Sequence, residues 1–429
     1  MKKIKKISPS RTIALGFLAL IVLGAILLYL PISHAEGQSL SFVDALFLST
    51  SATCVTGLSP VVVADTLNAF GKTVLGTLIQ IGGLGVACMG AAFALLLRRR
   101  IGMQQNTLLR EGWNLSSNSS FKELLKFALG ITLLCELSGA VLSFFVFVQK
   151  MPIPNAALTA LFHSVSAFNN AGFDILGADN LISYRGDILL TLTTAALIIF
   201  GGLGFTVYLD IREKRSLKKL SLHSKIVLFT TAALLILGTL ALLLLGDLNL
   251  LDSFFFSVSA RTAGFMTSPV GELSQASLFV ITVLMFIGAS PGSTGGGIKT
   301  TTFYTLLIIF KGLITGKKHQ SFHRSLPKDV TQKALMLFLV ALFTLLSATF
   351  LLCILEPQIP LMDLVVEATS AAATVGLSTG ITPNLCTASK LVLTIVMYIG
   401  RLGPLTVATI WTAKTQSNLS YSTESITIG

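Results

Sequence analysis

The chain has few charged residues and few side chains of the kinds that carry chemistry. Only 12% of its 429 residues are charged, against about 25% in soluble domains, and 53% are hydrophobic. This composition excludes an ordinary soluble globule, and also a disordered chain, which needs low hydrophobicity. The five cysteines show neither CxxC nor metal-ligand spacing, and neither an HExxH nor a paired aspartate motif occurs. We therefore predict that the chain is not an enzyme and carries no covalently bound cofactor.

What the chain has in excess is long apolar runs. Eight of them have about the length that a helix needs to cross a bilayer: 12–31, 72–97, 121–149, 187–210, 224–246, 277–310, 332–355 and 390–413. A helix satisfies every backbone amide internally, as lipid demands, and the alternation typical of outer-membrane barrels is absent. The sequence therefore predicts an all-α polytopic membrane protein.

The basic residues indicate how the spans are oriented. Of the 31 lysines and arginines, 24 lie before the first span or after the even-numbered spans. The positive-inside rule places that side, with both termini, in the cytoplasm of a cell membrane. Because these residues sit in short loops, the net charge of +12 needs no nucleic-acid partner. Ser33-His34-Ala35 after an apolar run also resembles a signal-peptide cleavage site, but the run is long, so we expect a retained helix.

The segments between the spans contain an internal repeat. Each of four segments has an apolar stretch, then small Ser, Thr and Ala residues, then a glycine: 41–60 with Gly57, 156–175 with Gly172, 250–269 with Gly264, and 361–380 with Gly376. The spans that follow also match, at 80–90, 200–210, 286–297 and 398–408. We therefore predict four span–pore helix–span units of like orientation around a pseudo-fourfold central pore: 12–97, 121–210, 224–310 and 332–413.

The four glycines suggest a site for a cation. Glycine allows the positive φ that turns successive carbonyls towards one axis, and a ring of carbonyls can replace the water shell of a cation. Thr374-Val375-Gly376 repeats the first three letters of the potassium-filter signature TVGYG. The predicted potassium selectivity filter is Val55, Thr56, Gly57, Asn170, Ala171, Gly172, Thr262, Ala263, Gly264, Thr374, Val375 and Gly376. Potassium is the expected substrate, with sodium as an alternative ion.

The sixth span is interrupted at residues 288–299, where six of twelve residues are Gly or Pro. A nucleotide-binding loop does not fit, because Ile298 separates Gly297 from Lys299 and no strand precedes it. Two interpretations stay open. The segment is either a kink in a long helix or a flexible intramembrane loop that crosses the pore below the filter.

With these motifs the chain resembles the membrane subunits of the Trk/Ktr/HKT superfamily of potassium transporters, most closely the KtrB type. The resemblance covers essentially the whole chain. It rests on the four units, one glycine per filter loop, the Gly-Gly-Leu-Gly stretches, the broken sixth span and an arginine in the eighth. Some plant relatives carry serine at the first filter position, so glycine at all four positions favours potassium over sodium.

The resemblance also implies a gate and partners. The implied gate residues are Ser290, Gly292, Ser293, Thr294, Gly295, Gly296, Gly297, Lys299 and Arg401. The implied assembly is a homodimer, each protomer with its own pore, regulated by a cytosolic ring of RCK-type nucleotide-binding proteins. The basic loops 98–122, 212–225 and 311–333 could dock that ring or bind anionic membrane lipid.

Charged residues inside apolar segments need partners. The resemblance implies that Arg401 faces the pore beneath the filter, with a structural salt bridge as the alternative. Glu136 is either structural or part of a cation or proton route. Arg261 is expected to face away from the ion path and brace the third loop against an acidic neighbour, and His163 is expected to pack.

The main alternative function is a sodium- or proton-coupled secondary transporter. The like orientation of the units and the scarcity of acids within the spans argue against it. Coupling of potassium to sodium, which would make the protein a symporter, stays open.

Overall fold

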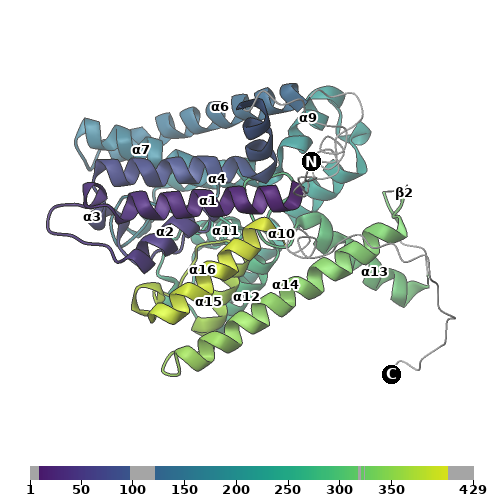
Figure 1. The fold of residues 1–429 in the computed structure, drawn as a ribbon. Helices are drawn as coiled ribbons and strands as arrows, with labels where there is room; N and C mark the ends of the chain where they lie inside the picture. Colours follow the sequence, from purple (N-terminus) through teal and green to yellow (C-terminus); the bar gives the residue numbers. More distant parts are fainter. Residues whose placement is uncertain (1–8, 97–120, 317–319, 323, 404–429) are drawn as a thin grey trace, which may run out of the picture.

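The computed structural model describes residues 9–96, 121–316, 320–322 and 324–403, and these ranges are mostly α-helical (Figure 1). The β structure within them is one antiparallel hairpin of β1 (Gln320–Ser321) and β2 (Arg324–Ser325). The short connecting elements are α3 (Val63–Thr66) and the 3-10 helices η1 (Pro31–Ser33), η2 (Ile182–Tyr184), η3 (Leu217–Lys219), η4 (Val270–Glu272) and η5 (Thr382–Asn384). The predicted all-α class is confirmed.

The long helices follow the predicted apolar segments. They are α1 (Pro9–Tyr29), α4 (Ala69–Leu96), α6 (Phe121–Phe147), α10 (Leu222–Leu245) and α14 (Lys328–Leu355). By length and composition, three helices of the described residues can cross a membrane: Lys126–Phe147, Leu222–Leu245 and Lys328–Leu355. A fourth does so if one bent helix pair counts as a single span.

The other predicted spans are interrupted. α8 (Ile188–Leu203) and α9 (Phe205–Lys214) meet at Gly204 with a bend of 86°, so the prediction of a continuous span at 187–210 is wrong. The sixth span divides into α12 (Gln275–Phe286) and α13 (Thr300–Thr315), which confirms its predicted interruption and excludes a simple kink. α16 (Thr387–Leu402) begins the predicted eighth span, whose residues 404–413 lie outside the described part.

Four shorter helices lie where the repeat predicts pore helices: α2 (Phe42–Cys54), α7 (Ile153–Phe168), α11 (Leu250–Ser259) and α15 (Leu361–Ala373). The small Ser, Thr and Ala residues that follow each apolar stretch continue the helix almost to the glycine. Ser41 and Asn249 begin α2 and α11, because their side chains accept hydrogen bonds from the backbone of Asp44 and Asp252.

The short helices pack in a closed cycle. α2 contacts α1, α4 and α16; α7 contacts α6, α8 and α4; α11 contacts α10, α12 and α8; and α15 contacts α14, α16 and α12. Each short helix thus contacts the two helices that flank it in its own predicted unit. It also contacts one helix of another unit, which is the preceding unit for α7, α11 and α15 and the fourth unit for α2. Figure 1 shows α1 and α4 side by side, with α2 against them.

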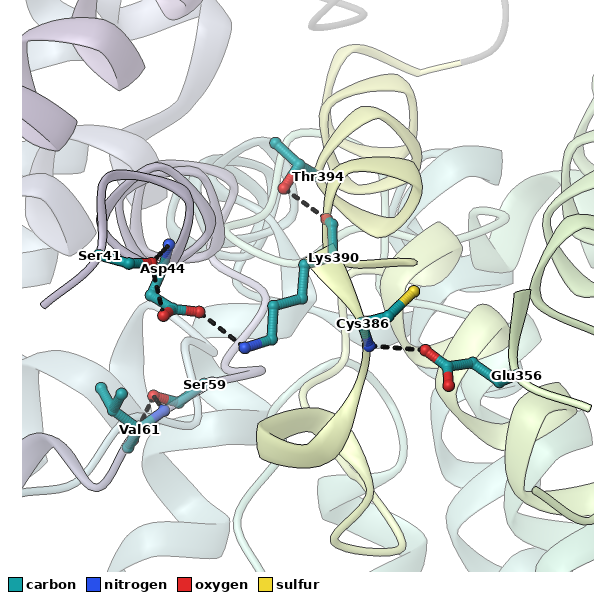
Figure 2. A network of polar contacts seen from close by, with 8 residues as sticks. All are labelled: Ser41, Asp44, Ser59, Val61, Glu356, Cys386, Lys390 and Thr394. Atoms are coloured by element: carbon teal, nitrogen blue, oxygen red, sulfur yellow. Dashed lines mark hydrogen bonds and ion pairs between the residues drawn. The ribbon is translucent and has the colours of Figure 1, made fainter. Parts of the chain in front are cut away.

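Ion pairs reinforce two junctions of this cycle. Lys390 in α16 reaches Asp44 in the first turn of α2, with 2.8 Å between Nζ and Oδ1 (Figure 2). Arg185, just before α8, reaches Asp252 in α11, with 2.9 Å between Nε and Oδ2. The pairs therefore join α2 to the last helix and α11 to the α8 region.

The outside of the bundle is apolar. α14 is the clearest case, since only 11% of its most apolar stretch is buried. Phe343, Leu346 and Phe350 on this helix are 72%, 60% and 65% exposed. Such an exposed apolar surface suits contact with lipid rather than with water.

Candidate ion-binding site

Each short helix leads into a loop in which two residues have positive φ. The residue two before each glycine has positive φ: Val55 (57°), Asn170 (58°), Thr262 (81°) and Thr374 (51°). The glycines follow with φ of 101° at Gly57, 69° at Gly172, 79° at Gly264 and 98° at Gly376. A β-branched residue in this region is a strained outlier. Three of these four residues are β-branched, and strain at the same position in three loops indicates a functional site.

The four glycines lie next to one another in a ring. A Cβ added to Gly57 would lie 2.5 Å from the carbonyl oxygen of Ala171, and one added to Gly172 would lie 2.5 Å from that of Ala263. A Cβ on Gly264 would meet the carbonyl oxygen of Val375, and one on Gly376 would meet that of Thr56. The contacts close a cycle of four, so no residue larger than glycine fits. We call residues 55–57, 170–172, 262–264 and 374–376 the ring loops.

Serines at the ends of the short helices hold the ring loops. The backbone carbonyls of Ser51, Ser166 and Ser370 accept hydrogen bonds of 2.7 to 2.8 Å from the amides of Thr56, Ala171 and Val375. The Ser51 and Ser370 hydroxyls also accept from the amides of Gly57 (3.1 Å) and Gly376 (2.9 Å). The backbone amides of these three loops therefore donate their hydrogen bonds to the serines near the ends of the preceding short helices.

The third ring loop is one residue shorter between its serine and its glycine. There the Ser259 carbonyl accepts from the amides of both Ala263 (2.8 Å) and Gly264 (3.3 Å). The Ser259 hydroxyl instead donates to the carbonyl of Phe265 at 2.5 Å. Although this segment is one residue shorter, Gly264 lies in the ring like the other three glycines.

The carbonyls of the ring loops have no partner among the described residues. None of the twelve accepts a hydrogen bond there, although the eight residues that precede the glycines are at most 1% exposed. Buried carbonyls are almost always paired. Unpaired carbonyls gathered in a ring are suited to coordinate a cation.

A second set of glycines, which was not among the predicted site residues, supports the ring from the following helices. A Cβ on Gly82, Gly201 or Gly400 would strike the carbonyl oxygen of Thr53, Phe168 or Ala372, each four residues before a ring glycine. Three residues further on, positive φ at Gly85, Gly204 and Gly403 breaks or ends the helix. The repeated Gly-x-Leu-Gly pattern was the available signal for these breaks.

The loop that interrupts the sixth span, residues 287–299, lies against the ring loops and is called here the interrupting loop. The Thr294 amide donates to the carbonyl of Gly201 (3.2 Å), and the Thr294 hydroxyl donates to that of Phe168 (3.1 Å). Gly295 and Gly296 leave no room for a Cβ against the side chains of Thr262 and Thr374. The loop therefore contacts three of the four chain segments that form the ring.

Other predicted gate residues hold the interrupting loop to itself and to its neighbours. The Ser293 hydroxyl donates to the carbonyl of Ser290 at 2.6 Å. The Gly292 carbonyl accepts from the amide of Phe205 at 3.0 Å, and the backbone of Gly297 packs against Gly288. These bonds give the loop a defined conformation.

Two cations bind the interrupting loop through its carbonyls. Lys299 Nζ donates to Gly295 (2.7 Å) and Gly296 (3.3 Å). Arg401 donates to Thr294 (2.5 Å) and to Gly82, so it joins α16, the loop and α4. Within the described residues Arg401 is in no ion pair, so the salt-bridge alternative has no support there. Both cations line a cavity of about 210 Å³ between the loop, α14 and α16.

The other singled-out residues brace the loops. Arg261 is 7% exposed and donates from Nη2 to the carbonyl of Gly288 at 3.4 Å. It braces the third loop as predicted, but its partner within the described residues is a carbonyl, not the expected acid. His163 is 1% exposed, packs on Phe147 and Phe265 and bonds the Thr194 hydroxyl at 2.8 Å, as predicted for a packing residue.

An apolar helical bundle around a ring of carbonyls that have no partner in the described part of the chain is an arrangement suited to a helical membrane protein that handles an ion. Comparison with known proteins gives the family. The sequence profile of the TrkH family, described as "cation transport protein", matches residues 8–245 and 227–422. The chain therefore belongs to the TrkH family of cation transport proteins. The predicted superfamily and the prediction that the chain is not an enzyme are confirmed.

Full-length relatives are similar throughout. The chain is 37% identical to the potassium/sodium uptake protein NtpJ of Enterococcus hirae, over 99% of this chain and 98% of that protein. It is 38% identical to the Ktr system potassium uptake protein B of Bacillus subtilis (97% and 96%) and 36% identical to that of Vibrio alginolyticus (98% and 94%).

A solved structure shares the fold. The potassium transporter TrkH of Vibrio parahaemolyticus matches with a TM-score of 0.73, over 97% of this chain and 88% of that chain, at 19% sequence identity. At this identity the likeness shows the fold alone.

Proposed function

We propose that the chain takes up potassium across the cell membrane through a channel-like pore whose selectivity filter is the four ring loops. The observation that carries the proposal is the closed cycle of Gly57, Gly172, Gly264 and Gly376, with buried carbonyls that have no partner among the described residues. A dehydrated cation needs just such oxygens. Relatives named as potassium uptake proteins support potassium as the ion.

The four predicted units, 12–97, 121–210, 224–310 and 332–413, each supply one ring loop to this pore. The repeated serine–amide hydrogen bonds and the repeated glycine contacts beneath the ring support this division. Both termini lie in the cytoplasm, as the distribution of basic residues indicates.

The interrupting loop is the gate. It lies against Thr262 and Thr374 of the ring loops, and Lys299 and Arg401 bind its carbonyls. Because nearly all these bonds involve backbone atoms of small residues, the loop can leave the ring without exposing large apolar side chains. Arg401 also places a positive charge beside the path of a cation.

The working unit is a homodimer regulated by a cytosolic ring of RCK-type nucleotide-binding subunits. The support is the resemblance to the Ktr type, whose relatives are named as parts of a Ktr system. Sodium transport is a second candidate, because one relative is named a potassium/sodium uptake protein.

The test is potassium and sodium flux into liposomes for the parent and Gly376→Ser. At φ of 98°, with a Cβ directed at the Thr56 carbonyl, serine should displace the ring. We expect potassium flux to fall by about tenfold or more, as 1.4 kcal/mol of misfit gives, and the preference over sodium to decrease. Gly380→Ser is the matched control, since φ there is 93° and no described atom lies within 4 Å of the added Cβ. Unchanged flux and preference in Gly376→Ser would remove the filter assignment.

A further inference from the structure

Two buried carboxylates near the ring take no part in the proposed filter or gate. Glu136 in α6 is 5% exposed and Glu367 in α15 is fully buried. The ion pairs of the described residues are Arg185–Asp252, Lys214–Asp210 and Lys390–Asp44, and neither glutamate takes part. An unpaired buried charge is expensive to maintain, so each carboxylate calls for an explanation.

Glu136 is fixed behind the second ring loop. Its Oε1 accepts a hydrogen bond of 3.0 Å from Asn169 Nδ2, and its Oε2 accepts one of 3.3 Å from Gln80 Nε2. Asn169 also donates to Gln80 Oε1 at 2.9 Å and immediately precedes Asn170 of the ring loop. The carboxylate therefore reaches the ring loop through one fully buried amide.

Glu367 is fixed behind the fourth ring loop. It lies nine residues before Gly376 on the short helix, and its Oε1 accepts from the Thr382 hydroxyl, which follows the loop. The Ser378 and Thr382 hydroxyls are hydrogen-bonded at 3.1 Å. Glu367 Oε2 has no partner among the described residues. The carboxylate thus connects the short helix to the chain that leaves the ring.

The two carboxylates lie behind opposite loops. In the cycle of glycine contacts, Gly172 and Gly376 are each flanked by Gly57 and Gly264, so they lie diagonally across the ring. In the first and third units the acids of the short helices, Asp44 and Asp252, are neutralised by Lys390 and Arg185. Glu136 and Glu367, unlike these acids at the starts of the short helices, have no cation as partner among the described residues.

The nearby cations do not cancel these charges directly. Arg261, Lys299 and Arg401 donate to backbone carbonyls at Gly288, in the interrupting loop and at Gly82. A carbonyl ring has no net charge of its own, and fixed negative charge in a poorly screened interior attracts a cation. We propose that Glu136 and Glu367 are positioning residues that act as carboxylates, holding the second and fourth ring loops and supplying the negative charge that raises affinity for the transported cation.

The inference rests on the proposed function and is tested by flux into liposomes. The half-saturating potassium concentration and the maximal rate are measured for the parent, Glu136→Gln, Glu367→Gln and the double variant. Each amide keeps the shape of its carboxylate and removes the charge. We expect each single change to raise the half-saturating concentration by about three- to tenfold, with the maximal rate within about twofold. The double variant should multiply the single effects, as distant sites do.

Controls separate charge from structure. Glu272→Gln changes an exposed acid in η4 and should leave both parameters as in the parent. Glu136→Asp keeps the charge and should retain most of the parent affinity. The melting temperature of each variant without potassium checks folding, and its rise on titration with potassium measures binding independently of transport. Because the two sites are separate, either one can be tested if a variant at the other does not fold.

Several outcomes would overturn the inference. They are an unchanged half-saturating concentration in both amide variants, a loss confined to the maximal rate, or a lower affinity in Glu136→Asp than in Glu136→Gln. If the parent carries no potassium, the proposed function fails as well. If the parent carries potassium and Gly376→Ser abolishes its preference while the amide variants keep the parent affinity, this inference alone fails.

Discussion

The third unit of the chain differs from the other three on both sides of the ring. The segment between Ser259 and Gly264 is one residue shorter than its counterparts and contains Arg261. In the other units a single glycine (Gly85, Gly204 or Gly403) breaks or ends the helix below the ring, whereas in the third unit a whole loop, residues 287–299, separates α12 from α13. Yet Gly264 makes the same contacts in the ring as the other three glycines.

This difference shows in which part of the molecule the four units must be alike. In the proposed filter a cation contacts all four loops together, so each must present its carbonyls alike. The shorter segment in the third unit is accommodated because the Ser259 carbonyl accepts from two amides. Below the ring no such constraint applies. Under the proposed function one unit can therefore specialise as a barrier, and Arg261, bound to Gly288, ties the third ring loop to the start of the interrupting loop.

The largest expected effect comes from removing what is special to the third unit. Deleting Gly295–Gly297 takes away the part of the interrupting loop that lies against Thr262 and Thr374. We expect potassium flux without regulatory subunits to rise by about tenfold or more, the effect of a 1.4 kcal/mol shift towards an open state. The measurement is flux into liposomes, with the ratio of potassium to sodium flux as the control for an intact ring. Flat flux in a protein that still folds contradicts the gate assignment.

A smaller effect should separate Gly204 from Gly85. A Cβ on Gly204 would lie 2.6 Å from the carbonyl oxygen of Pro291, while a Cβ on Gly85 meets no described atom within 4 Å. The two glycines have similar positive φ, 91° and 80°, with extended ψ, so alanine strains both backbones by about 1–3 kcal/mol. Only Gly204→Ala should also displace the interrupting loop. We expect its flux to change by roughly fivefold and that of Gly85→Ala to stay within about twofold. Equal effects would show that strain alone is responsible.

The sequence predicted the helices and the ring glycines well, because apolar length and a repeated small-residue pattern carry those signals directly. It predicted continuous spans where Gly204 bends the chain by 86°, because the apolar run continues through the break. Local preference argues against positive φ at Val55 and Thr374, so only the assembled ring explains those conformations.

Hydrogen-bond partners that are backbone atoms could not be predicted either. Arg401 binds the carbonyls of Thr294 and Gly82, and Arg261 binds that of Gly288. Because every residue has a backbone carbonyl, residue type does not indicate which one will accept a hydrogen bond. This is why an acid was expected beside Arg261. The Glu136–Gln80–Asn169 contacts did have a signal, three polar residues in three different apolar segments, but nothing in the sequence paired them.

The smallest expected effect compares the two ion pairs that join the first and third units to their neighbours. Asp252 is 1% exposed and accepts from Arg185, from Asn249 Nδ2 (2.9 Å) and from the Thr267 hydroxyl (2.6 Å). Asp44 is 21% exposed and accepts from Lys390 (2.8 Å) and from the Ser41 hydroxyl (2.7 Å) (Figure 2). Arg185 is itself 46% exposed and Lys390 12%, so the comparison depends on the acids. Asp252 is the more deeply buried acid and accepts more hydrogen bonds, so its loss should cost more.

We expect Asp252→Asn to destabilise the protein by about 2 kcal/mol, since it weakens charged hydrogen bonds in a buried network, and Asp44→Asn by about 0.5 kcal/mol. The measurement is the melting temperature in detergent, with Lys390→Gln and Arg185→Gln as the partner variants. Potassium affinity should stay near the parent value in all four, because these acids lie at the starts of the short helices, a full helix length from the ring glycines. A larger loss of stability in Asp44→Asn than in Asp252→Asn would mean that burial does not set the strength of these junctions. Burial would then also be a poor reason to expect the third unit to be held more firmly than the first.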